Sequence, residues 1–120
     1  MTSSINIAWL AGYLEGEGSF TIYSKEKFKQ FRIEFSSSDL DVVRRVRRIM
    51  KSNRIICLRK QNYTQLASKK KPEYYLKIYQ SEAIQWMMTI YSLMGDRRKS
   101  KIKEIILIWK SHKPVRSKIA

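Results

Sequence analysis

The sequence is poor in the residues that build disulfides and zinc sites. It has one cysteine, Cys57, and one histidine, so neither an intrachain disulfide nor a Cys/His zinc site can form within one chain. Cys57 lies in an apolar run, where we expect a buried, inert thiol. No apolar stretch reaches the ~20 residues that a membrane span needs. The first residues, MTSSIN, lack the pattern of a secretory signal or an Arg-rich organellar leader, so we expect neither.

Acidic residues are scarce as well. Ten acids face 25 lysines and arginines, which gives the 120 residues a net charge of +15. Phosphate backbones are the usual partner of such an excess, because their neutralisation releases condensed counterions. A membrane surface would require an amphipathic helix with a free apolar face, and a solvated basic surface is the remaining alternative. At 43% hydrophobic residues the chain can still bury a core, so we expect one domain over residues 1–120.

Hydrophobic spacing predicts an α+β fold without internal repeats or a linker. The predicted helices cover 5–17, 38–51, 81–94 and 96–110, and the predicted strands cover 19–25, 31–38, 54–60 and 73–80. We expect loops elsewhere and a flexible basic tail over 111–120. Consecutive strands joined by short connections predict antiparallel pairs.

Cap residues refine these boundaries. Ser4 or Asn6 is a candidate N-cap for the first helix, and Ser81 for the helix that starts there. Gly95 fits the position just after the end of that helix. Trp86, Met87 and Met88 lie at helical spacing, where we expect core side chains.

Strand alternation gathers polar and aromatic residues on one sheet face. Many of these types pair with base edges or phosphates, and a two-stranded ribbon fits the major groove. The alternative is an ordinary solvated face. The candidate DNA-binding residues are Thr21, Tyr23, Lys25, Gln30, Arg32, Glu34, Ser36, Tyr75, Lys77 and Tyr79, with Lys69 and Lys70 as candidate phosphate contacts.

The first helix has two different faces. Ile7, Leu10 and Leu14 cluster as a core stripe, and the small residues at 8, 12 and 16 form a second face. Glycine inside a helix costs about 1 kcal/mol relative to alanine, so Gly12 and Gly16 require a compensating use. Close approach of a second helix is that use, as small residues spaced by four allow. The alternative is a poor helix that ends at Gly12.

The acids at the end of this helix raise a second question. Glu17 meets the negative end of the helix dipole, which is unfavourable by ~0.3–1 kcal/mol. A bound cation would offset this, and Mg²⁺ is typically held by one or two carboxylates plus substrate phosphates. Two packed copies of the helix would bring two Glu17 side chains together. Without a partner helix, Glu17 is an exposed acid, and the residue pattern alone leaves these interpretations level.

The stretch LAGYLEGEGSF, residues 10–20, resembles the signature of the LAGLIDADG homing endonucleases. The resemblance implies an αββαββα unit with a four-stranded antiparallel saddle that lies in the major groove. It also implies that two units pack their motif helices at the centre, with Ala8, Gly12, Tyr13 and Gly16 at the dimer interface. Glu17, with Gly16 beside it, is the implied ligand of Mg²⁺, and Mn²⁺ or Ca²⁺ can occupy the same sites. Glu15 is more fitting as a structural residue.

Two positions depart from the family pattern. Relatives often carry a polar residue such as Gln near the end of the second strand to position water, and Ser37 is the match here. A basic residue before the last helix assists near the scissile phosphate in relatives. Arg97, Arg98 and Lys99 are the candidates, of which we favour Lys99 for catalysis and take the two arginines as DNA contacts.

One motif in 120 residues implies a homodimer and a long, near-palindromic DNA site. The predicted function is a homodimeric, Mg²⁺-dependent, site-specific DNA endonuclease. The alternatives are an intron maturase, or a non-catalytic nucleic-acid-binding protein on the same fold. The abundance of Ile, Lys, Tyr and Asn is typical of an AT-rich genome such as a mitochondrial one.

Overall fold

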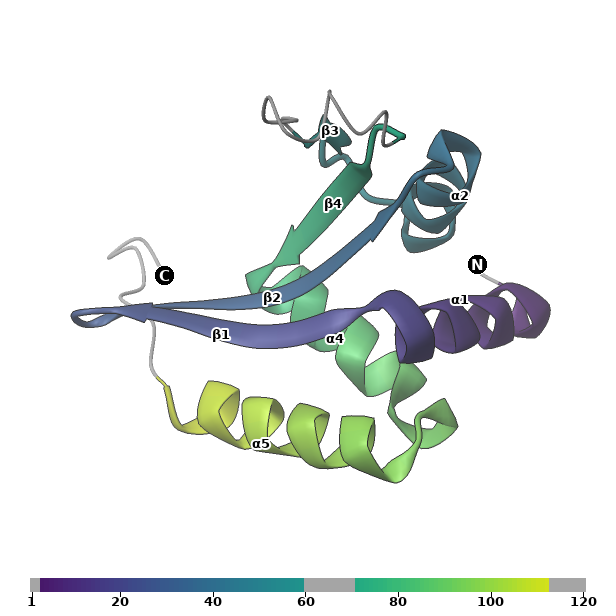
Figure 1. Ribbon diagram of the computed structural model, residues 1–120. Helices are drawn as coiled ribbons and strands as arrows, with labels where there is room; N and C mark the ends of the chain where they lie inside the picture. The colour runs from purple at the N-terminus through teal and green to yellow at the C-terminus, as the bar shows by residue number, and fades with distance from the viewer. Residues whose placement is uncertain (1–2, 60–70, 113–120) are drawn as a thin grey trace.

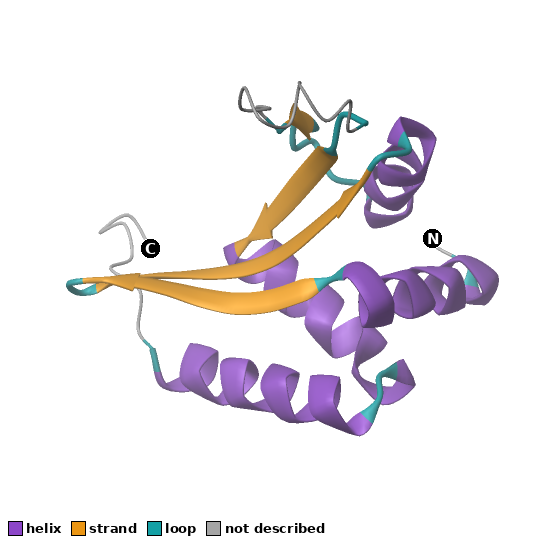
Figure 2. Ribbon diagram, viewed as in Figure 1, coloured by secondary structure: helices purple, strands orange, loops and turns teal. Residues whose placement is uncertain are grey.

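A four-stranded antiparallel sheet, backed by helices on one face, organises the computed structural model, which describes residues 3–59 and 71–112 (Figure 1). The elements in chain order are α1 (Ser4–Glu17), β1 (Ser19–Lys25), β2 (Phe28–Ser37), α2 (Leu40–Met50), β3 (Cys57–Leu58), β4 (Tyr74–Tyr79), α4 (Gln80–Ile90), a 3₁₀ turn η1 (Tyr91–Leu93) and α5 (Asp96–Ser111). The sheet order is β1-β2-β4-β3. Figure 2 shows the helices on one side of the sheet and the β1–β2 hairpin extending beyond them. This confirms the predicted α+β fold class.

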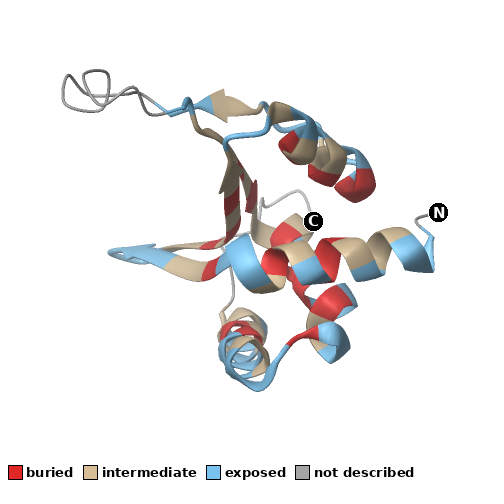
Figure 3. Ribbon diagram, turned by 45° about the vertical axis from the view of Figure 1, so that its right-hand side comes forward, coloured by how far each residue is buried: buried red, intermediate tan, exposed pale blue. Residues whose placement is uncertain are grey.

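The core lies between the sheet and the helices. Alternate residues of the strands face it, with Phe31, Ile33, Leu76 and Ile78 all 0–1% exposed. α2, α4 and α5 contact this face of the sheet, and α1 packs against α2, α4 and β2. Figure 3 shows the buried positions on the inner sides of the helices, and the exposed hairpin tip. The opposite face of the sheet is therefore left open.

Several predicted boundaries were wrong at the caps. Ser3, rather than Ser4 or Asn6, caps α1, because its Oγ accepts a hydrogen bond from the Asn6 N–H at 3.2 Å. Gly95 precedes α5 as its N-cap instead of following α4. α5 includes Ser111, so the helix extends one residue into the predicted tail.

The start of α4 also differs from the prediction. Tyr79 occupies the N-cap in place of Ser81, and Gln80 has a left-handed backbone with φ of 55°. The Gln80 amide accepts from the Phe31 N–H at 2.8 Å and donates to the Lys29 carbonyl at 3.2 Å. β4 stops pairing with β2 at Tyr79, so the Gln80 side chain continues the hydrogen bonding that a longer strand would supply.

The third strand is much shorter than predicted. β3 contains only Cys57 and Leu58, which pair with Tyr75 and Tyr74 of β4. Cys57 is half-buried, not buried. Met88 is 57% exposed, whereas Met87 is in the core and Trp86 packs partly against it. The second strand begins at Phe28, so the hairpin turn is limited to Glu26 and Lys27.

Candidate functional site

The small-residue face of α1 is bare. Ala8, Gly12 and Gly16 are exposed. A Cβ atom added at either glycine would meet no atom within 4 Å. Ile5, on the same side of the helix, is 77% exposed. The described part of the chain therefore leaves this face free for contact with another molecule.

Tyr13 points to its own subunit. Its ring stacks on Trp9 at a centroid distance of 5.7 Å and meets the Phe35 ring edge-on at 6.0 Å. Its hydroxyl donates to the Ser36 carbonyl at 2.7 Å. Burial, followed by the nearby Glu17 carboxylate, raises the pKa of Tyr13 to about 12. These contacts fix α1 against β2, and they favour a structural role over the predicted interface role, which stays a prediction.

The two motif acids have different surroundings. The Glu15 carboxylate accepts the Gly95 N–H at 2.5 Å and lies 3.6 Å from the Arg98 Nε. Glu15 therefore binds the N-terminus of α5, where the helix dipole favours an anion. Glu17 is exposed and, among residues 3–59 and 71–112, has no hydrogen-bond or ion-pair partner.

The end of α1 fits a divalent cation in the kind of oxygen donors it offers. The last four carbonyls of a helix have no partner within it. Here the Gly18 N–H takes the Leu14 carbonyl at 2.9 Å, and the backbone hydrogen bonds of the described residues outside the helices and strands include none to the carbonyl of Gly16, which precedes Glu17 in the chain. A Cβ at Gly18 would lie 2.7 Å from the Leu14 oxygen, so this closure requires glycine. In the described residues, no group of three or more His, Cys, Asp or Glu is placed to hold a metal ion.

The three basic candidates at the start of α5 point in different directions. Arg98 is turned inward, with a side chain 14% exposed, beside Glu15 and with its guanidinium 5.7 Å from the Phe20 ring centroid. Lys99 lies against Tyr91, with 5.9 Å from Nζ to the ring centroid. Arg97 is exposed. The contacts of Arg98 favour a structural role, and the roles predicted for Arg97 and Lys99 stay predictions.

Ser37 is engaged in a backbone turn. Its Oγ accepts the Asp39 N–H at 3.0 Å, just before α2 begins. The hydroxyl thus supports the start of that helix, where Asp39 makes no side-chain cap. A water-positioning role for Ser37 stays a prediction.

The open face of the sheet brings together the predicted DNA-binding residues of the strands. The register aligns Thr21 with Arg32 and Tyr79 in one row, and Glu34 with Lys77 in the next. Rows further along hold Tyr23 with Gln30, and Ser36 with Tyr75. Lys69 and Lys70 lie outside the described residues.

Arg32 occupies the middle of this face. Its Nε donates to the Gln30 amide oxygen at 2.7 Å and its Nη1 contacts the Glu34 carboxylate at 3.1 Å. The guanidinium lies 4.8 Å from the Tyr23 ring centroid. Three neighbours therefore hold the orientation of Arg32, which reduces the side-chain entropy that it would lose on binding a ligand.

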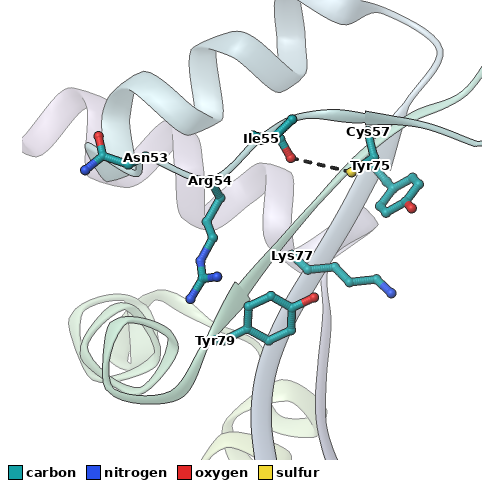
Figure 4. Close-up of a pocket in the computed structure, with 7 residues that line it drawn as sticks. All are labelled: Asn53, Arg54, Ile55, Cys57, Tyr75, Lys77 and Tyr79. Atoms are coloured by element: carbon teal, nitrogen blue, oxygen red, sulfur yellow. Dashed lines mark hydrogen bonds between the residues drawn. The ribbon is translucent and has the colours of Figure 1, made fainter.

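The sheet face is hollowed at its β3 end by a cavity of about 420 Å³ (Figure 4). Arg54 points toward Tyr79 there, with its guanidinium 4.7 Å from the ring centroid, and Arg59 lies 5.1 Å from that of Tyr75. The Cys57 thiol is the main cause that raises the pKa of Tyr75. Asn53, Arg54 and Arg59 were not among the predicted site residues, because the face to which each residue of so short a strand belongs cannot be read from its apolar run. The cavity is lined by Asn53, Arg54, Ile55, Cys57, Tyr75, Lys77 and Tyr79.

No helix in the described ranges has the length and apolar character needed to cross a lipid bilayer.

The comparison with curated protein sequences gives no match. The fold of this chain does resemble those of solved structures. The group I intron-encoded homing endonuclease I-CeuI, complexed with DNA, superposes with a TM-score of 0.64 at 14% identity over 92% of this chain and 56% of that chain.

Two structures of the homing endonuclease I-CvuI with target DNA resemble it as well. One, with 2 mM Mg, gives a TM-score of 0.62 at 16% identity over 88% of this chain and 66% of that chain. The other, with 2 mM Ca, gives a TM-score of 0.64 at 15% identity over 90% of this chain and 68% of that chain. The chain thus spans between about half and two thirds of these proteins, and at such identity the likeness shows the fold. The LAGLIDADG-like domain family matches residues 4–90, and the chain therefore belongs to that family.

Proposed function

We propose that two copies of this chain form a homodimer that cuts both strands of a DNA duplex at a specific, near-palindromic site with the help of Mg²⁺. The observation that carries the proposal is the free Glu17 carboxylate at the end of a helix whose glycine face is bare. A carboxylate in that position is unfavourable unless a cation is near. The bare face supplies a place for the second copy.

The proposed dimer packs α1 against its twin across Ala8, Gly12 and Gly16. Space for a Cβ at both glycines means that a second backbone can approach closely there. Burial of Ile5, which is 77% exposed in one chain, would add apolar contact area. This packing would bring the two α1 ends, with one Glu17 each, to the same region beside the dimer axis.

The open face of the sheet is the proposed DNA reader. Lysines and arginines on this face contact phosphates, and the pre-oriented Arg32 offers the donor pattern that pairs with guanine in the major groove. The related structures of I-CeuI and I-CvuI are complexes with DNA, which supports a DNA duplex as the partner.

In the proposed mechanism, Glu17 and the Gly16 carbonyl would hold the divalent cation. A bound Mg²⁺ supplies Lewis-acid chemistry to a phosphodiester and favours ionisation of water. The chain itself positions this pair of donors through the Glu15 contact with Gly95, which fixes α1 against α5. Arg97 and Lys99 lie near this end of α5 and would neutralise part of the charge that develops on the phosphate.

The test is cleavage of a randomised DNA library with Mg²⁺ by wild type, Glu17→Gln and Glu104→Gln. Glu104 is an exposed acid on α5 and serves as the matched control. We expect Glu17→Gln to reduce cleavage by at least ~100-fold while it keeps DNA binding, as for loss of one group that acts in the transition state. Equal cutting by wild type and Glu17→Gln would remove Glu17 from the mechanism, and cutting that persists with a chelator would remove the metal.

A further inference from the structure

A cationic surface covers the outer side of α2 and the turn after it. It lines a cavity of about 470 Å³ and consists of Arg44, Arg47, Arg48, Lys51, Ser52 and Asn53. We call these six residues the α2 patch. Four of these residues carry a positive charge and none of them is acidic, so the surface attracts anions.

The charges of the α2 patch are not balanced within the described part of the chain. None of its four cations has an ion-pair partner there. Arg44 lies four residues before Arg48, and Arg47 four residues before Lys51, so like charges face each other on the helix surface. Such pairs destabilise a helix. A bound polyanion would offset this repulsion.

Arg45 provides a contrast within the same helix. Its guanidinium lies 3.9 Å from the Trp9 ring centroid, so it has a use inside the protein, between α2 and α1. Arg44 and Arg48 are exposed and make no such contact in the described residues. Arg44 and Arg48 are therefore accessible to a ligand outside the chain.

The α2 patch is continuous with the DNA-facing side of the sheet. Asn53 lines both the patch and the sheet cavity that holds Arg54 and Tyr79. The Arg47 Nη1 donates to the Arg54 carbonyl at 3.4 Å, which links the helix to the segment that leads into β3. Figure 4 shows the Asn53 side chain turned away from Tyr75 and Tyr79, whereas Arg54 points toward Tyr79. The α2 patch and the sheet cavity therefore adjoin at Asn53.

We propose that the α2 patch binds the phosphate backbone of the bound duplex where that duplex continues beyond the sheet. The proposal rests on the proposed function, since the sheet must hold DNA first. Arginine suits the role because its planar guanidinium can bind a phosphate through two hydrogen bonds. Contacts of this kind add affinity and fix the path of the DNA without reading sequence. A separate RNA strand, which offers the same phosphates, is an outcome that the test distinguishes.

The experiment compares two mixed-sequence DNA duplexes and a mixed-sequence single-stranded RNA in fluorescence anisotropy without divalent metal, so that cleavage plays no part. One duplex has the length that the sheets of a dimer can cover, and the other extends it by one helical turn, about 10 base pairs, at each end. The patch variant is Arg44→Gln/Arg48→Gln/Lys51→Gln, which leaves the Arg47 contact intact. The control is Lys101→Gln/Lys103→Gln/Lys110→Gln, with the same charge change on exposed residues of α5.

We expect wild type and control to gain affinity from the longer duplex, and the patch variant to lose that gain. For every three phosphate contacts that the dimer loses, the fall in affinity between about 50 and 200 mM salt should be ~40-fold smaller for the patch variant on the longer duplex. Thermal melting should show a patch variant at least as stable as wild type, because the like-charge pairs are gone and glutamine is as good a helix former as arginine. This guards against a binding loss through misfolding.

Equal length dependence in the patch variant and the control would overturn the proposal. So would a patch variant that keeps the gain from the longer duplex but loses binding to single-stranded RNA, since the patch would then serve RNA. If wild type binds neither duplex, the proposed function fails together with this inference. If wild type binds the shorter duplex, the proposed DNA partner stands whatever the patch does.

Discussion

Glu15 and Glu17 are two residues apart at the end of the same helix, yet their carboxylates meet opposite electrostatic surroundings. Both face the unfavourable end of α1. Glu15 reaches the favourable N-terminal end of α5 at Gly95 and the guanidinium of Arg98. Glu17 reaches no such group among the described residues. One acid therefore stabilises the fold, and the other is free for a ligand.

Substitution of Glu15 by Gln should lower the free energy of unfolding by about 1–2 kcal/mol, because a charge-assisted hydrogen bond is lost and the buried Arg98 Nε keeps no anionic neighbour. Glu17→Gln should leave stability unchanged or slightly higher, because it removes an anion from the wrong end of the helix. Chemical denaturation of both variants measures this. A stability loss in Glu17→Gln as large as that in Glu15→Gln would contradict the assignment.

Tyr13→Phe removes the hydrogen bond to the Ser36 carbonyl and should cost about 1 kcal/mol of stability near neutral pH. The pKa of Tyr13 is about 12 in the folded chain, against 10.0 in the unfolded chain. The unfolded tyrosine thus loses its proton first as pH rises, so the stabilisation is complete below pH 10.0 and is lost as pH approaches about 12. The stability difference between wild type and Tyr13→Phe should shrink over this range. A difference that is constant up to pH 12 would argue against a shifted Tyr13.

At the scale of elements, the glycines of α1 lower the stability of the single chain and favour close packing in the proposed dimer. Gly12→Ala should stabilise an isolated chain by about 0.5–1 kcal/mol, because the Cβ meets nothing and alanine is the better helix former. The same Cβ would separate two closely packed α1 helices and weaken the dimer. Sedimentation and thermal melting of wild type and Gly12→Ala measure the two effects.

Ala8→Gly is the control for this experiment, since it lowers helix propensity on the same exposed face without adding volume. It should destabilise the chain and leave the dimer contact open. Dimers of equal strength in Gly12→Ala and wild type would place the interface elsewhere.

The elements themselves could largely be predicted from the sequence, because most are long and amphipathic with a clear period. α2 illustrates this, since Val43, Val46, Ile49 and Met50 form an unbroken buried stripe opposite the arginines. The end of β4 could not be predicted, because it depends on a tertiary contact. Gln80 takes a left-handed backbone to bond β2 through its side chain, which no local propensity indicates.

Some parts of the candidate site could likewise be predicted from the sequence, and others could not. The alternating residues of β1, β2 and β4 could be assigned to one face because a strand has period two. The partners of Glu15 and Arg98 could not be predicted, because they join residues 80 or more positions apart. β3 is too short for the sequence to indicate which of its residues lie on which face of the sheet. The cavity beside Arg54 could therefore not be predicted.

At the scale of the whole molecule, the charge that suits DNA opposes self-association. Each chain carries +15, so two chains that meet along α1 repel each other until counterions or DNA intervene. Salt should therefore act in opposite directions on the two equilibria. It screens the repulsion between chains, and it weakens DNA binding because counterion release becomes less favourable.

We accordingly expect the dimer dissociation constant of the free protein to fall as salt rises from about 50 to 300 mM, over which the Debye length shortens from roughly 14 to 6 Å. The DNA dissociation constant should rise over the same range by about 10-fold or more. A short duplex added at low salt should promote the dimer, since phosphates neutralise the charge that keeps the chains apart. Analytical ultracentrifugation with and without DNA separates these effects. A free dimer that weakens with salt would mean that ion pairs hold the interface, and the uncharged contact of Ala8, Gly12 and Gly16 supplies none.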